Sequence, residues 1–378
     1  MRNTRILAAM LLLSSFLTAC SNEQVIERLG FIHTVAFDLA DGKKGDMQKL
    51  LVTFSLPQVE EGAKESRETL TTTAYSSKDA HEKLSRKTNR LLVAGQARNV
   101  LIGLSLAQSG LSNKLDTLLR DPSIGPRVKV TIVDGNANDV LRKKFSEHPR
   151  TSQYIDRMLE KEARSHGFME TNVYTFMRDF FDDGIDPTAP IIKAGKKDIT
   201  LEGMGLFKGD RAVHILPAKQ ARLLLMLRQN VKSNEISINV RREGKETEQR
   251  LMYTNIMSKR KIKVERTASQ KTKVHITLKL NGSILEYNGD MNLREWGNQY
   301  KLERLLTQYI RNTLKKTIAE LQKKKVDPLG IGQHVRNSMT YEEWKALDWE
   351  SFYSSLDIEC HVQVRIKDIG EFNRQSIH

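Results

Sequence analysis

The first twenty residues are organised as an export signal that ends in a cysteine. Arg2 and Arg5 give a basic start, residues 6–17 form an apolar run, and the small residues Thr18-Ala19 precede Cys20. The run is about 12 residues long, whereas a helix needs about 20 to cross a hydrocarbon core. We therefore predict that residues 1–19 are a signal peptide that is removed, and that the rest of the chain folds after export.

The cysteine at the cut site predicts a bacterial lipoprotein signal. A thiol at this position can take a diacylglyceryl thioether before cleavage exposes the amine of Cys20. The alternative is a plain secretory signal beside a coincidental cysteine, but the chain has only 2 cysteines and the residues before Cys20 suit a lipoprotein signal. We expect lipidation of Cys20 and a mature chain held by lipid on the outer face of a membrane.

The length and hydropathy of the remaining chain predict a body that stays in water. A chain of 378 residues is long enough for two or three domains with hydrophobic cores of their own. The longest later apolar run, residues 221–228, contains Arg222 and ends at Arg228, and it is far shorter than a membrane span.

The net charge of +15 is compatible with three kinds of partner: anionic lipid, nucleic acid or an acidic protein surface. Export argues against nucleic acid. Next to an anionic bilayer, a well-placed Lys or Arg contributes about 1 kcal/mol of attraction. The clusters at 259–263 and 323–325 are candidates for such contacts, with ordinary solvated surface charge as the alternative.

The hydrophobic patterns predict an α+β fold of three mixed domains, each a sheet packed with helices. Residues 20–196 alternate strand and helix patterns, which favours helices packed on a sheet. Residues 197–258 read as a small middle domain with a glycine-bearing bend at 203–205, a hairpin and a helix that starts at Pro217. Residues 259–378 contain an alternating strand at 273–282, a long amphipathic helix at about 300–325 and a final strand near 360–366.

The individual elements follow from the same patterns. Strands are predicted at 31–38, 49–56, 68–75, 100–102, 128–133, 212–216, 236–240 and 250–257, and helices at 77–92, 111–119, 138 onward, 152–164, 173–181 and 341–353.

No catalytic, cofactor-binding or metal-binding residues are predicted, so we expect no enzyme activity and no cofactor. HExxH, CxxC, GxSxG, the phosphate loop and the dinucleotide loop are all absent from the sequence. His275 lies in a strand pattern and is more simply an ordinary exposed or half-buried residue than a ligand. Cys360 is most simply a small strand residue, and lipidation of Cys20 would leave it without a disulfide partner.

An acidic cluster follows the predicted helix at 173–181. It consists of Asp179, Asp182, Asp183 and Asp186, but it lacks the closing Glu of an EF-hand loop. A helix C-terminus with a solvated loop is the preferred interpretation, and weak Ca²⁺ binding is the alternative.

Several elements occur in an order that resembles one known family. They are Cys20 followed by Leu29-Gly30-Phe31, the hairpin at 203–210, and the run from Asp327-Pro328-Leu329-Gly330-Ile331-Gly332 through Trp344 and Trp349 to a last strand that ends at Gly370. Together they resemble the Ger(x)C family of spore germination lipoproteins, the C subunits of nutrient germinant receptors. Members often carry a tryptophan just after the lipidated cysteine, where this chain has Ser21-Asn22-Glu23.

The resemblance implies a lipid-anchored protein on the outer face of the spore inner membrane. It also implies assembly with two integral membrane subunits, of the A and B types, in nutrient-triggered germination. It supplies no catalytic residues, and it leaves open whether this subunit touches a small-molecule germinant. The alternative is a solute-binding lipoprotein of a membrane transporter, although that class has two similar lobes. No motif favours a cell-envelope hydrolase.

Overall fold

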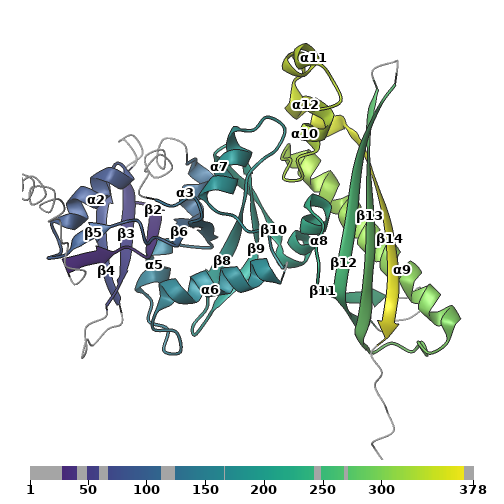
Figure 1. The fold of residues 1–378 in the computed structure, drawn as a ribbon, viewed down its shortest axis with the longest axis horizontal. Coiled ribbons are helices and arrows are strands. Elements are labelled where there is room, and N and C mark those ends of the chain that lie inside the picture. The colour runs from purple at the N-terminus through teal and green to yellow at the C-terminus, as the bar shows by residue number, and fades with distance from the viewer. Residues whose placement is uncertain are drawn as a thin grey trace, which may run out of the picture.

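The computed structural model describes residues 28–40, 49–58, 67–111, 124–165, 167–241, 248–267 and 271–369. The predicted signal peptide, Cys20 and nearly all of the predicted helix at 111–119 lie outside these residues. The described chain forms two large sheets, one at each end of an elongated molecule (Figure 1). None of the helices in this part of the chain combines the length and apolar character needed to span a bilayer.

The first sheet has eight strands in the order β10-β9-β8-β7-β6-β2-β3-β4. Its centre is parallel and both of its flanks are antiparallel. All five residues of β6 are buried, as expected for a central strand covered on both faces. The strands are β2 (Thr34–Leu39), β3 (Leu50–Pro57), β4 (Arg67–Ala74), β6 (Asn99–Gly103), β7 (Lys129–Val133), β8 (Thr188–Ala194), β9 (Ile199–Lys208) and β10 (Arg211–Pro217).

Helices cover both faces of this sheet. Successive residues of β6 enter different cores: Leu101 packs in the cluster that contains Ile155 of α6, and Ile102 in the cluster that contains Phe176 of α7. The helices of this part are α2 (Ser77–Ser85), α3 (Leu104–Ser109), α5 (Ala137–Arg142), α6 (Thr151–Arg164) and α7 (Val173–Phe181).

Two local predictions in this region are wrong. The helix predicted at 77–92 ends at Ser85, because Leu91–Val93 forms the short strand β5, which pairs in parallel with β1 (Leu29–Phe31). The bend predicted at 203–205 does not interrupt the strand: β9 continues through these residues and pairs with β8 on one side and β10 on the other, with a β-bulge-like register shift opposite β8 just before Gly203. The hairpin turn at Gly209 is present, with φ of 53°.

The second sheet has four strands in the order β11-β12-β13-β14. Its pairs are antiparallel except β13 with β14, which is parallel. The strands are β11 (Asn234–Arg241), β12 (Glu248–Arg266), β13 (Thr272–Tyr287) and β14 (Asp357–Ile369), and the helices of this part are α8 (Ala218–Arg228), α9 (Trp296–Lys324), α10 (Ile331–Arg336), α11 (Tyr341–Ala346) and α12 (Trp349–Ser355).

One face of this sheet packs against α9, the helix predicted at about 300–325. The helix contributes an apolar stripe that is at most 4% exposed, made of Leu302, Leu306, Ile310, Leu314, Ile318 and Leu321. Alternate residues of β13 meet it, namely Val274, Ile276, Leu278 and Leu280. The residues between them, including His275 and Lys279, therefore lie on the opposite face.

The structure confirms the α+β fold class, with sheets packed by helices. Strand pairing and one long strand cross both of the predicted domain boundaries, however. Residues 196/197 fall between β8 and β9, which pair with each other, and residues 258/259 fall inside β12. One apolar core runs from β9 and β10 through α8 to the second sheet. The bounds of the three predicted domains stay a prediction.

The stripe of α9 yields the first test. Leu314 is 0% exposed, so Leu314→Ala should lower the free energy of unfolding by about 2–5 kcal/mol through lost burial and a cavity. Its exposed neighbour is the control, and Lys315→Ala should change that energy by less than about 0.5 kcal/mol. Urea unfolding followed by circular dichroism measures both, and equal effects would contradict the packing described.

Candidate functional site

We expected the acidic cluster at the end of α7 to lie in a solvated loop. The structure instead shows its carboxylates bonded to other parts of the molecule. Asp182 accepts hydrogen bonds from Arg336 at 2.7 Å and from Gln333 at 2.6 Å, and both of these residues belong to the α10 region. Arg336 also donates to the carbonyl oxygen of Asp183 at 2.7 Å. Asp179 is 4% exposed and pairs with Arg228 of α8. These carboxylates therefore join the first sheet to the helices of the second, at what we call the junction (residues 179–186 against 327–336).

At the centre of the junction, two hydrogen bonds join Asp186 and Asp327. One is between the two backbones, and the other is between a backbone N–H and a side chain. The N–H of Asp327 donates to the Asp186 carboxylate at 2.7 Å, and the N–H of Asp186 donates to the carbonyl of Asp327 at 2.9 Å. The Asp327 carboxyl accepts from the N–H of Gly332 at 2.7 Å and is 1% exposed. Burial raises the pKa of Asp327 to about 7, and it also raises the pKa of Asp186.

Two glycines let the backbones touch at this point. Gly184 has φ of 93°, and its carbonyl accepts from the N–H of Gln333 at 3.1 Å. A Cβ on Gly332 would lie 2.5 Å from the Cα of Gly184 and 2.8 Å from the ring of Trp349. No side chain fits between the two segments, which explains why glycine stands at both positions.

Aromatic side chains of α11 and α12 close the junction on the α9 side. The Trp349 ring centroid lies 5.4 Å from that of Trp344 and 5.4 Å from that of Tyr353. Tyr353 is 1% exposed, and burial raises the pKa of its hydroxyl. The run from Asp327 to Trp349, which carries the resemblance, thus builds a packed contact between two parts of the molecule.

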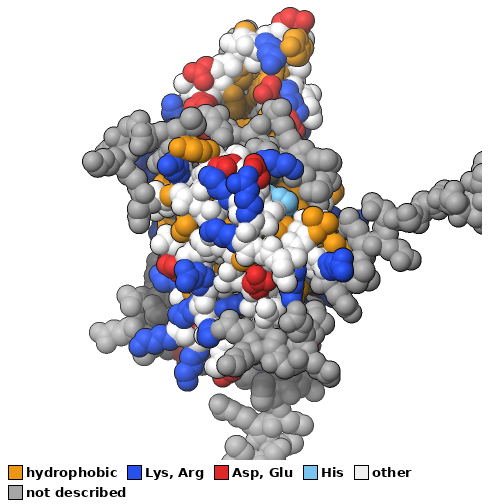
Figure 2. All heavy atoms as spheres, turned by 90° about the vertical axis from the view of Figure 1, so that its left-hand side faces the viewer, with side chains coloured by type: hydrophobic (Ala, Val, Ile, Leu, Met, Phe, Trp, Pro, Cys, Tyr) orange, Lys and Arg blue, Asp and Glu red, His pale blue; other side chains and the backbone are white. Residues whose placement is uncertain are grey.

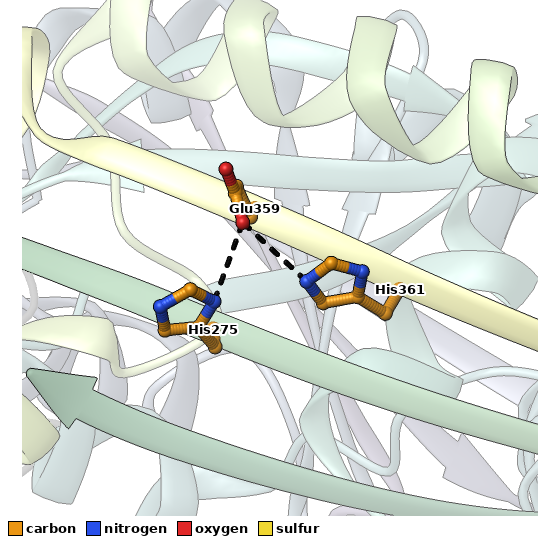
Figure 3. Close-up of side chains that lie close together, drawn as sticks. All are labelled: His275, Glu359 and His361. Carbon is orange, nitrogen blue, oxygen red and sulfur yellow. Dashed lines mark ion pairs between the residues drawn. The ribbon is translucent and has the colours of Figure 1, made fainter.

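A second cluster lies on the open face of the second sheet, opposite α9. His275 of β13 stands directly across from Glu359 of β14, and His361 follows two residues later on the same face. One oxygen of Glu359 is 3.4 Å from Nδ1 of His275 and 3.4 Å from Nε2 of His361 (Figure 3). Lys273 bonds the other oxygen and lowers the pKa of Glu359.

No spacing along the sequence signals this cluster, because His275 and Glu359 are far apart along the chain. Only the parallel register of β13 and β14 brings them together. His275 lies in a strand as predicted, and of the two expected environments, exposed or half-buried, it has the half-buried one. Cys360 also lies in β14 as expected, and burial raises the pKa of its thiol to about 11, which disfavours the reactive thiolate.

The basic clusters lie on the second sheet and its long helix. Lys259, Lys261 and Lys263 are exposed on β12, and Lys323–Lys325 are exposed at the end of α9. The cluster on β12 lies in the second sheet, on the far side of the molecule from α2 and β5 (Figure 1), whereas Lys323–Lys325 directly precede the junction residues.

Comparison with known proteins places the whole described chain in one family. A family model described as the spore germination protein N-terminal domain matches residues 22–194. A second, described as spore germination B3/GerAC like, C-terminal, matches residues 202–370. The chain belongs to the Ger(x)C family of spore germination proteins.

Full-length relatives and a solved structure agree with this family. The chain is 23% identical to the spore germination protein GerQC of Bacillus cereus, over 95% of this chain and 97% of the relative. It is 24% identical to the putative spore germination protein YfkR of Bacillus subtilis, over 97% of each. The crystal structure of the GerBC protein has the same fold, with a TM-score of 0.54 and 16% identity, over 88% of this chain and 97% of that one.

The glycine contact yields a prediction with a matched control. Gly332→Ala forces a Cβ against backbone, so we expect the free energy of unfolding to fall by about 1–3 kcal/mol. Gly297 is also helical, but a Cβ there would meet nothing within 4 Å, so Gly297→Ala should be neutral or stabilising by up to about 1 kcal/mol. Urea unfolding measures both, and a neutral Gly332→Ala would contradict the close approach.

The buried carboxyl of Asp327 predicts a pH dependence of stability. Its folded pKa, about 7, is above its ordinary value of 3.8, so the folded state keeps a proton that the unfolded state has lost. The stabilisation is complete below about pH 4 and is lost as pH rises to about 7, with a slope of at most about 1.4 kcal/mol per pH unit. Asp327→Asn should flatten this slope in urea unfolding between pH 4.5 and 7.

The control for this experiment is Asp183→Asn, which makes the same chemical change on a carboxylate whose side chain is 58% exposed. A wild-type slope that survives in Asp327→Asn would show that other groups cause the pH dependence.

Proposed function

We propose that this protein is the lipid-anchored C subunit of a spore germinant receptor, required for nutrient-triggered germination. It acts by assembly with two integral membrane subunits, of the A and B types, on the outer face of the spore inner membrane. The observation that carries the proposal is the match of both germination-protein regions across nearly the whole chain. The lipoprotein signal that ends at Cys20 supports the anchor.

A lipid on Cys20 would hold a defined end of the molecule close to the bilayer. Cys20 and Arg28 are eight positions apart in the sequence, so the chain between them can span at most about 30 Å. Arg28 leads into β1, which pairs with β5 beside α2. Figure 2 looks onto this end, where Lys and Arg side chains are more widespread than Asp and Glu. Arg28, Lys78, Arg86 and Lys87 are exposed there, and a basic surface would add attraction to an anionic bilayer.

Exposed aromatic side chains on both sides of the junction offer a surface for protein contact. Phe181 at the end of α7 is 72% exposed, and Tyr341 at the start of α11 is 70% exposed. The ion pair of Asp183 with Lys345, at 3.4 Å, links the two segments. Aromatic residues are enriched at protein interfaces, so this surface fits a protein neighbour better than it fits bulk water.

The anchor is tested by changing each cysteine in turn. Cys20→Ala should move the protein from the membrane fraction of spores to the soluble fraction and abolish the nutrient response. Cys360→Ala removes the other thiol, which lies half-buried in β14, and should leave the protein in the membrane fraction. Fractionation followed by immunoblotting measures the distribution, and a Cys20→Ala protein retained on the membrane would refute lipid anchoring at this residue.

The receptor role is tested by deletion of the gene and by co-purification. Spores without the gene should lose germination to one class of nutrient while still responding to a chemical that bypasses receptors. Purification from spore membranes should recover two integral membrane subunits, identified by mass. A normal response to every nutrient would refute the proposal.

The alternative of a solute-binding lipoprotein has one observation in its favour. An open pocket with a volume of about 870 Å³ lies between α6 and α8. Its lining includes Arg150, Arg157 and Arg222. Calorimetry of the purified protein with amino acids and sugars separates the two functions. Micromolar or tighter binding at this surface, with a normal germination response after deletion of the gene, would favour the transporter role.

A further inference from the structure

We propose that His275, Glu359 and His361 form a binding site for a divalent transition-metal ion, with Zn²⁺ as the best match. The site lies on the open face of the second sheet, away from the junction and from the tethered end. It does not depend on the role in germination proposed above.

The strands supply the three donors without any loop rearrangement. His275 and Glu359 are directly opposite each other in the parallel register of β13 and β14, and His361 is the next residue of β14 on the same face. The donor atoms of the three side chains all lie within 4.8 Å of one another. The two imidazole rings are nearly parallel, with 12° between their planes and 5.9 Å between their centroids. Figure 3 shows the Glu359 carboxylate between them.

The distances favour tetrahedral coordination. Ligand atoms about 2.0–2.1 Å from a common tetrahedral ion lie about 3.3–3.4 Å from each other. The Glu359 oxygen is 3.4 Å from Nδ1 of His275 and 3.4 Å from Nε2 of His361. Two of the three edges of the ligand triangle thus already have the length that a zinc ion requires. Three protein ligands leave a fourth position for water.

The surroundings of the cluster match those of a metal site. Lys273 bonds the Glu359 oxygen that faces away from the histidines, which orients the carboxylate and leaves its other oxygen for the ion. Nε2 of His275 is buried and makes no hydrogen bond, although the Glu265 carboxylate lies 3.4 Å away. A small rotation of this ring would let Nε2–H donate to Glu265 while Nδ1 binds the ion, the arrangement in which a carboxylate orients a zinc-bound histidine.

Carboxylates and lysines both surround the histidines. Glu265, Asp357 and Glu359 contribute three negative charges, Lys263 and Lys273 pair with them, and Lys261 lies across Thr277 from His361. The donor atoms, and not the net charge, therefore favour a cation at this position. Two imidazole nitrogens and one carboxylate form a donor set that suits zinc and similar transition ions, whereas Ca²⁺ and Mg²⁺ prefer oxygen ligands alone.

A bound ion would tie together strands that are distant in the sequence. β14 is the edge strand of the sheet and reaches β13 only after the whole of α9 to α12. One ion that bridges His275 to Glu359 and His361 would therefore fasten the last strand of the chain to the sheet core.

The test is a zinc titration of the detergent-solubilised full-length protein after removal of metal with a chelator. Competition against a chromophoric chelator should give one Zn²⁺ per chain. His361→Ala and Glu359→Gln should each weaken the affinity at least tenfold. His148→Ala removes a half-buried histidine that stacks on Tyr154, outside the cluster, and should keep the wild-type affinity.

Two further measurements distinguish loss of the metal site from unfolding and test the choice of metal. Circular dichroism checks that the variants fold. We expect His361→Ala to fold normally, because the side chain of His361 is 60% exposed. Co²⁺ in place of Zn²⁺ should give the intense visible absorption of a tetrahedral site, and Ca²⁺ and Mg²⁺ should not compete. Absence of stoichiometric Zn²⁺ binding, or equal affinity in wild type, His361→Ala and Glu359→Gln, would overturn the proposal and leave the cluster as a network of ion pairs.

Discussion

The position of one sheet against the other depends on two carboxyl groups, Asp186 and Asp327, that share a site nearly closed to water. Each residue donates its backbone N–H to the other, so the two segments hold each other in register. Two full negative charges so close together at low dielectric would repel, and burial shifts both groups toward the protonated form. The raised pKa of Asp327 and the Lys208 ammonium, 3.9 Å from the Asp186 carboxylate, both reduce this repulsion.

The other contacts of the junction come from the same loop after α7. Beside the Asp186–Asp327 pair, Gly184 lies against Gly332, and Asp182 accepts a hydrogen bond from Arg336. A dry centre of short hydrogen bonds is thus surrounded by ion pairs that are more open to solvent. This order explains why glycines, acids and tryptophans occur together in the run that carries the resemblance.

Local patterns predicted most of the elements, because alternation and helical spacing report directly on burial. The stripe of α9 and the alternation of β13 are examples, and both have the predicted faces. The patterns failed where tertiary pairing decides the outcome. Leu91 and Leu92 suit a helix, but pairing with β1 makes them a strand. Asp182 suits a solvated loop, but its partners Gln333 and Arg336 lie in a distant part of the sequence.

The parallel pairing of β14 with β13 has a consequence for the order of events in biosynthesis. The second sheet lacks its last strand until residues 357–369 have been synthesised, because these residues form β14. Until then one edge of β13 stays unpaired, with backbone groups that can template association with other strands. Loss of residues 357–369 would therefore leave this edge of β13 open to association with other chains, and would harm the protein far more than the small number of missing residues suggests.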